Sequence, residues 1–299
     1  MNLKEFMQKL PEEQVEYDFT NEITAWFSEN IEHNGRIKAD KKKQLDKLVK
    51  QITEEKDPIR RFLYFKLPIE DGGATFDCDS WNGSCSLTDE IYSKLWGYDK
   101  DWFTGFGGDT MNSFWSPYKF AWQIANKQKP SIRGYPYNSS INDILTNFEE
   151  CNKELMSKED LYKELMVFAS RTHSIGNYVL VQNGFNGFRG VRLCDRWDYS
   201  LEYLKNEFGR IYFYNYVRTF FLNDYVAEDS GIVDLSKADS SNNKSLESDR
   251  LLNPVDFFTN VTTLEHCECE LIKYLQNVNK KIFRRGERIV NELQRMEDA

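Results

Sequence analysis

A short stretch of the chain, Arg171 to Asn177, concentrates side chains that can do chemistry. It reads Arg-Thr-His-Ser-Ile-Gly-Asn, and after an apolar run it is followed by further possible donors and acceptors at Asn183, Asn186 and Arg189. Histidine exchanges protons near neutral pH, arginine binds phosphate and carboxylate through its fork of donors, and asparagine both donates and accepts. Glycine within the same stretch allows close approach of the backbone. This composition predicts a binding or catalytic site.

We expect such a site to act on a phosphate-bearing ligand, either a nucleotide or a nucleic acid. In this hypothesis His173 is the acid or base, and Arg171 and Arg189 bind the anion. Asn177 and Asn186 position the ligand. The alternative is that His173 is structural and only pins its loop through the two ring nitrogens.

Three aspartates elsewhere could contribute to the same chemistry. Asp109 follows a Gly-Gly pair and precedes an amphipathic segment, so we expect it to begin a helix and to contact a ribose or a metal there. Asp77 and Asp79 could hold a divalent cation through their carboxylates, and this is the cofactor that the sequence suggests. The alternative for that pair is two solvated turn residues.

Several of these motifs resemble those of a family of bacterial proteins of unassigned function. They are Arg171 to Asn177, the later Phe-Asn and Arg-Gly pairs, Asp195-Arg-Trp-Asp198, and Gly108-Asp-Thr-Met-Asn-Ser-Phe114. The segment from Ile175 to Leu180, together with Asn186, is also similar to a motif of HNH-type nucleases that restrict modified DNA. That resemblance implies a nuclease with an upstream histidine as general base, and His33 is the histidine that precedes His173 in this chain.

The elements that would carry these residues are mostly helices. Apolar residues recur at helical spacing over much of the chain, and Tyr178-Val-Leu-Val181 is the best strand candidate. Signals for the start of a helix occur at Asp57 before a proline, at Ser86, and at Ser139 or Ser140. We therefore expect a mainly α-helical fold with a small β element and a long C-terminal helix.

Composition divides the chain into three parts. We expect a main helical domain over residues 1–226, an acidic linker or lid over 227–253, and a C-terminal helix over 254–299 that packs on the main domain. The apolar stripe of that helix should pack against residues 201–221, because that segment becomes apolar nearly all round after Ile211 and should be deeply buried. A homodimer through the stripe is the alternative.

Charge and hydropathy narrow the expected partners. The net charge of −9, from 48 acidic and 39 basic residues, disfavours nucleic-acid binding over the whole surface. Basic stretches at 38–50 and 280–288 could bind nucleic acid locally, although a solvated helix face is the simpler interpretation. We find neither a membrane-spanning run nor a secretory signal, so we expect a cytoplasmic protein with free cysteines.

A non-catalytic protein is the competing hypothesis. In it the chain binds or inhibits another protein, as a phage or host-defence component does, through its acidic surface and C-terminal helix. The two hypotheses differ in what surrounds His173. An open polar pocket that joins His173 to Asp109 would favour catalysis, and a buried loop with satisfied polar groups would favour binding.

Overall fold

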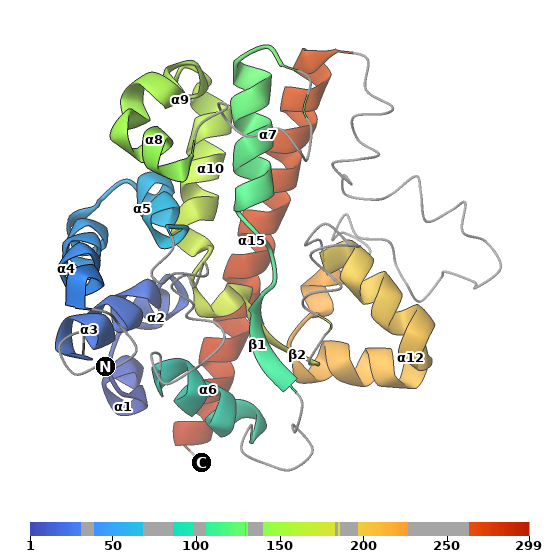
Figure 1. The fold of residues 1–299 in the computed structure, drawn as a ribbon. Helices are drawn as coiled ribbons and strands as arrows, with labels where there is room; N and C mark the ends of the chain where they lie inside the picture. The colour runs from blue at the N-terminus through green and yellow to red at the C-terminus, as the bar shows by residue number, and fades with distance from the viewer. Residues whose placement is uncertain are drawn as a thin grey trace.

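The structure, a computed structural model, describes residues 1–30, 39–67, 86–97, 106–128, 130, 140–182, 185, 197–226 and 263–298. These residues form helices and one small two-stranded antiparallel sheet, which confirms the expected mainly α-helical class (Figure 1). In chain order the elements are α1 (Leu3–Met7), α2 (Pro11–Val15), α3 (Thr20–Asn30), α4 (Ala39–Glu54), α5 (Pro58–Phe65), α6 (Ser86–Trp96), β1 (Phe106–Thr110), α7 (Trp115–Ala125), α8 (Ile141–Thr146), α9 (Phe148–Met156), α10 (Glu159–Arg171), the 3-10 turn η2 (Ile175–Asn177), β2 (Tyr178–Gln182), α12 (Trp197–Thr219), the 3-10 turn η3 (Asn223–Tyr225) and α15 (Leu264–Glu297).

Local sequence signals account for several of the helix starts. Asp57 caps α5 by accepting from the backbone N–H of Arg60, and Pro58 occupies the first helical position. Ser140 caps α8 in a capping box with Asp143. Both starts agree with the expectation from sequence, as does the start of α6 at Ser86.

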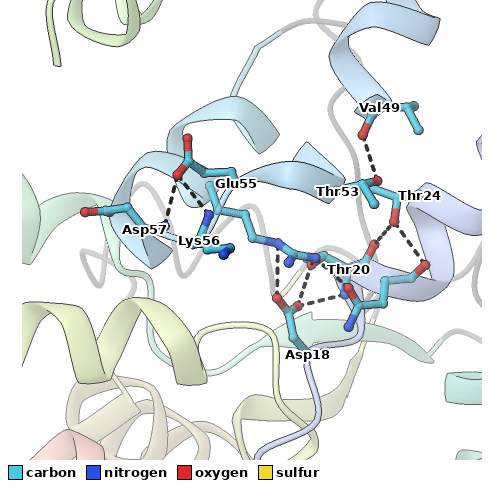
Figure 2. A network of polar contacts seen from close by, with 10 residues as sticks. Asp18, Thr20, Thr24, Val49, Thr53, Glu55, Lys56 and Asp57 are labelled. Carbon is cyan, nitrogen blue, oxygen red and sulfur yellow. Dashed lines mark hydrogen bonds and ion pairs between the residues drawn. The ribbon is translucent and has the colours of Figure 1, made fainter. Parts of the chain in front are cut away.

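Side-chain hydrogen bonds and an ion pair also connect the N-terminal helices to one another (Figure 2). Arg61 on α5 donates from Nη2 to Thr20 Oγ1 at 2.8 Å and to Asn21 Oδ1 at 2.7 Å. Its Nε lies 3.3 Å from Asp18 Oδ2. The other oxygen of Asp18 accepts from the backbone N–H of Thr20 at 2.9 Å, at the start of α3. One guanidinium therefore ties α5 to the beginning of α3.

The sheet pairs β1 with β2, from Phe106 opposite Gln182 to Thr110 opposite Tyr178. The expected strand at 178–181 is confirmed. The expected helix start at Asp109 is wrong, because Asp109 lies within β1 and α7 begins only at Trp115. Pairing with the buried strand β2 overrides the helix-capping preference of an aspartate after two glycines.

The 34-residue helix α15 runs through the middle of the molecule (Figure 1). It packs against α10 and η2 and also contacts α2 and α7. Its apolar stripe is buried within the chain at Cys267, Leu271, Leu275, Val278, Ile282, Ile289 and Leu293. The expected core packing is thus confirmed for the described part of the stripe, while residues 227–253 and 254–262 lie outside the described residues. Among the described helices, none has both the length and the apolar character needed to cross a bilayer.

The expected partner of that stripe, residues 201–221, is wrong. Helix α12 bends at Gly209, whose φ of 80° and ψ of 168° are not helical, and its two arms stand to one side of α15 (Figure 1). The arm of α12 that follows Gly209 is buried on one face only. Phe213 is 0% exposed whereas Ile211 is 83% exposed. The all-round apolar character of this segment therefore does not correspond to deep burial, and α10 occupies the position along α15 instead.

Candidate functional site

The stretch from Arg171 to Asn177 connects α10 to the sheet through η2. It passes beside the middle of α15, with which η2 is in extensive contact. Residues Thr172, Ser174, Ile175, Gly176 and Asn177 are buried, while Arg171 and His173 are half-buried. The motif that sequence analysis selected as a site therefore lies mostly inside the fold.

Arg171 connects three helices. Its Nη2 donates to Glu16 Oε1 at 2.5 Å and its Nε donates to Glu16 Oε2 at 3.1 Å, just after α2. Its Nη1 donates to the carbonyl oxygen of Asn279 on α15 at 3.0 Å, and its guanidinium lies 4.9 Å from the ring centroid of Phe283. The paired geometry is the one in which arginine binds a carboxylate most strongly. Glu16 thus occupies the fork that the sequence assigned to a ligand anion.

His173 packs between aromatic rings. Its imidazole stacks on Phe62 with centroids 6.0 Å apart and lies 5.3 Å from the ring of Phe65, both on α5. Its backbone carbonyl accepts from the N–H of Phe19 at 3.0 Å. These contacts place His173 at a junction between α5 and the N-terminal helices.

Asn177 uses its whole side-chain amide inside the protein. Oδ1 accepts from the backbone N–H of Asn112 at 3.0 Å and from its Nδ2 at 3.1 Å. Nδ2 donates to the carbonyl oxygens of Asn112 at 3.1 Å and Thr172 at 2.8 Å. An amide offers two donors and two acceptor lone pairs, and all four are engaged. Asn177 therefore fixes the segment after β1 against the end of α10 and has no polar capacity left for a ligand.

Arg285 on α15 is a central residue of this region that sequence reasoning missed. The side chain is 0% exposed. Its Nε donates to the carbonyl oxygen of Phe220 at 2.9 Å, and its Nη1 donates to those of Ile175 at 3.3 Å and Gly176 at 2.8 Å. One guanidinium thus holds η2 and the end of α12 against α15.

Burial of the charged guanidinium of Arg285 costs free energy. Burial lowers the pKa of this guanidinium to about 10. Its Nη2 has no hydrogen-bond partner among the described residues. The interpretation of residues 280–288 as a solvated basic face is therefore wrong for two members, since Lys281 is also buried at 5% exposure. The sequence did contain a signal that Arg285 would be buried. By helical spacing, position 285 falls between Ile282 and Ile289 on the apolar stripe.

The polar contacts of Asn177 continue through Asn112 to the 3-10 turn η3. Asn112 Nδ2 also donates to the hydroxyl of Tyr225 in η3 at 3.0 Å. Burial raises the pKa of Tyr225, and the nearby charge of Arg285 opposes that rise. Asn112, Asn177, Tyr225 and Arg285 therefore form one buried region that joins η2, η3, α15 and the segment between β1 and α7.

Of the other predicted site residues, only Asp109 lies in the part of the chain that the structure describes. Asp109 is 6% exposed in β1, opposite Val179 of β2. Asp77, Asp79, Asn183, Asn186 and Arg189 lie outside the described residues, so their roles stay predictions. Within the described ranges no group of three or more His, Cys, Asp or Glu side chains could hold a metal ion.

Comparison with known proteins identifies no relative: no protein-family model, no curated protein and no solved structure matches this chain. The described part defines a mainly helical protein whose most chemically suggestive motif is enclosed by α5, α10 and α15.

Proposed function

We propose that this chain is a non-catalytic protein-binding protein. The observation that carries the proposal is that the side chains of Arg171 and Asn177 bond to other groups of the protein. Glu16 engages the fork of Arg171, and the four bonding positions of the Asn177 amide are filled by Asn112 and Thr172. A catalytic or phosphate-binding site needs such groups pointed at a ligand, whereas a structural junction uses them as seen here.

The exposed apolar side chains support the same proposal. Four large apolar side chains are exposed among the described residues, and three of them, Phe208, Ile211 and Tyr214, lie within seven residues of one another on α12, on both sides of the bend at Gly209. Isolated exposed apolar residues are ordinary, but a local group of them is typical of a surface that contacts another protein.

The test compares protein binding with phosphate-ligand chemistry in the same preparation. The tagged full chain is purified from its source cells, and any stoichiometric companion is identified after nuclease treatment. The purified chain is then incubated with nucleoside triphosphates, single-stranded DNA and double-stranded DNA with Mg²⁺. We expect a protein companion, no turnover and no ligand-dependent rise in melting temperature.

His173→Ala provides the decisive variant, because His173 is half-buried and its loss should leave the fold intact. We expect the variant to retain the companion. Turnover of a nucleotide or nucleic acid by the wild type that His173→Ala abolishes would overturn the proposal and restore the catalytic hypothesis. Absence of any companion from source cells would also contradict it.

A further inference from the structure

The two arms of α12 are joined at a single residue, Gly209. Its φ of 80° and ψ of 168° fall in a region of backbone space that is essentially restricted to glycine. A Cβ atom placed there would meet nothing within 4 Å, and all six residues from Asn206 to Ile211 are exposed. The bend therefore depends on the conformational freedom of glycine and not on a crowded corner.

The contacts close to the bend also permit a straight helix. Residues on both sides of Gly209 are already helical, so a change at this one residue converts the bent α12 to a straight one. A bend leaves backbone N–H and carbonyl groups without helical partners, and a continuous helix pairs them. The rings of Phe208 and Tyr212 lie with centroids 5.0 Å apart across the bend. Residues four apart are also neighbours on a continuous helix, so straightening retains this contact.

Each arm of α12 is held by its own contacts with the rest of the protein. Leu201 and Leu204 are buried in the arm before Gly209. In the arm after it, the hydroxyl of Tyr216 donates to the carbonyl oxygen of Leu180 at 2.7 Å, and Trp96 Nε1 donates to that of Thr219 at 2.9 Å. The arms stand at an angle in these positions (Figure 1). A straight α12 therefore cannot keep both arms in place on one chain.

We propose that Gly209 is the hinge of a domain exchange between two copies of this chain. When α12 straightens, the part of the chain after Gly209, which includes η3 and α15, takes its place on the second copy, and the second copy does the same in return. The contacts between the two parts re-form between chains, including the packing of α15 on α10. The closed chain and the exchanged dimer then differ mainly at the hinge, and strain in a short hinge favours exchange. This exchange needs only a second copy of the chain, so it does not depend on the proposed binding of another protein.

Gly209→Ala tests the hinge directly. Alanine is strained in the bent conformation and favours a continuous helix, so it penalises the closed chain and not the exchanged dimer. A factor of about ten at each of two hinges lowers the dissociation constant of the dimer by about a hundredfold. Light scattering after size-exclusion chromatography measures the dimer fraction of protein refolded over a range of concentrations. Gly97→Ala is the matched control, because Gly97 follows α6 with a φ of 60°, and it should keep the oligomeric state of the wild type.

A longer hinge should have the opposite effect. Insertion of Gly-Ser-Gly after Gly209 interrupts a straight helix, whereas the exposed corner of the bent form can accommodate it. We expect refolding at high concentration to give some dimer of the wild type and none of the insertion variant. This comparison tests the hinge even if Gly209→Ala does not fold. Equal dimer fractions for the two chains, or no wild-type dimer at any concentration, would overturn the proposal.

An ion pair reports which chain supplies α15. Lys158 precedes the hinge and Glu268 follows it, and Lys158 Nζ lies 2.7 Å from Glu268 Oε2, so a carbodiimide can join them through an amide bond. Isotopically light and heavy copies of the wild type, and of Gly209→Ala, are unfolded, mixed in equal amounts and refolded. The dimer of each is then isolated, cross-linked and digested for mass spectrometry. Exchange predicts Lys158–Glu268 cross-links with one light and one heavy half. Cross-links within single isotopes alone would show that the dimer forms through surface contacts, and would overturn the proposal.

Discussion

Gly176 lies so close to Ile282 that a Cβ atom at position 176 would be 2.0 Å from the Ile282 carbonyl oxygen. Any side chain there would collide with the backbone of α15 rather than with a movable side chain. On the facing helix, a Cβ at Gly286 would lie 3.7 Å from Gly176 Cα, which is an ordinary contact. The two backbones pack directly on each other at this point.

Gly176→Ala should therefore be severely destabilising. Overpacking costs typically about 1–3 kcal/mol, and a collision with backbone should reach or exceed the upper end of that range. Gly286→Ala is the milder comparison, since the nearest atom to its Cβ would be a side-chain methyl of Val15 at 3.0 Å rather than backbone, and alanine favours a helix. Urea unfolding should show a much lower midpoint for the first variant. Equal midpoints would contradict the contact.

Asn177→Ala should lower the free energy of unfolding by about 2–4 kcal/mol, because it leaves buried groups of Asn112 and Thr172 without their partners. Asn206→Ala, at an exposed position of α12, is the control and should change little. Thermal unfolding followed by circular dichroism measures both. A stable Asn177→Ala protein would mean that its amide is not a structural bridge.

Leu275→Asp should prevent folding, because Leu275 is 0% exposed in the apolar stripe of α15 and burying a charged carboxylate there carries a large desolvation penalty. Asn291→Asp introduces the same side chain at an exposed position of that helix and should fold normally. Size-exclusion chromatography and circular dichroism distinguish the two. A folded, monomeric Leu275→Asp protein would contradict burial of the stripe within one chain.

Asp89 gives a stability that depends on pH. Burial raises the pKa of this carboxyl from 3.8 to about 6. The folded state then binds the proton more tightly than the unfolded state, so this group's contribution is fully present below about pH 4 and is lost as pH rises through 6.

Asp89→Asn removes that ionisation. The variant should gain stability relative to the wild type as pH rises from 4 to 7, by about 1 kcal/mol after allowance for the half-exposed position. Urea unfolding at several pH values measures the difference. A difference that stays constant over this range would show that Asp89 titrates normally.

Local signals in the sequence were sufficient for much of the fold. The cap at Asp57, the strand from Tyr178 and the buried stripe through Leu275 each follow from rules that involve nearby residues only. β1 could not be predicted in this way, because Phe-Gly-Gly-Asp-Thr becomes a strand only through pairing with β2. The bend at Gly209 had a local signal, the glycine itself, but helical spacing on both sides of it concealed the change of direction.

The candidate site shows an even clearer contrast between what local sequence signals predict and what tertiary contacts decide. Its residue types suggested chemistry, yet Glu16, Asn112 and Arg285, which determine how those residues are used, are distant in sequence and reach them only through tertiary packing. No spacing rule connects them. A polar, glycine-containing motif is therefore equally suited to enclosing a helix junction and to holding a ligand.

The position of α15 also bears on the order in which the chain can fold. Helix α2 packs on α15, so segments that are far apart in the sequence must meet before the centre of the molecule is complete. During synthesis α2, α5 and α10 emerge long before the helix on which α2 and α10 pack. The faces of α2 and α10 that pack on α15 cannot be buried until α15 has been synthesised, and closing contacts over so long a stretch of chain slows folding.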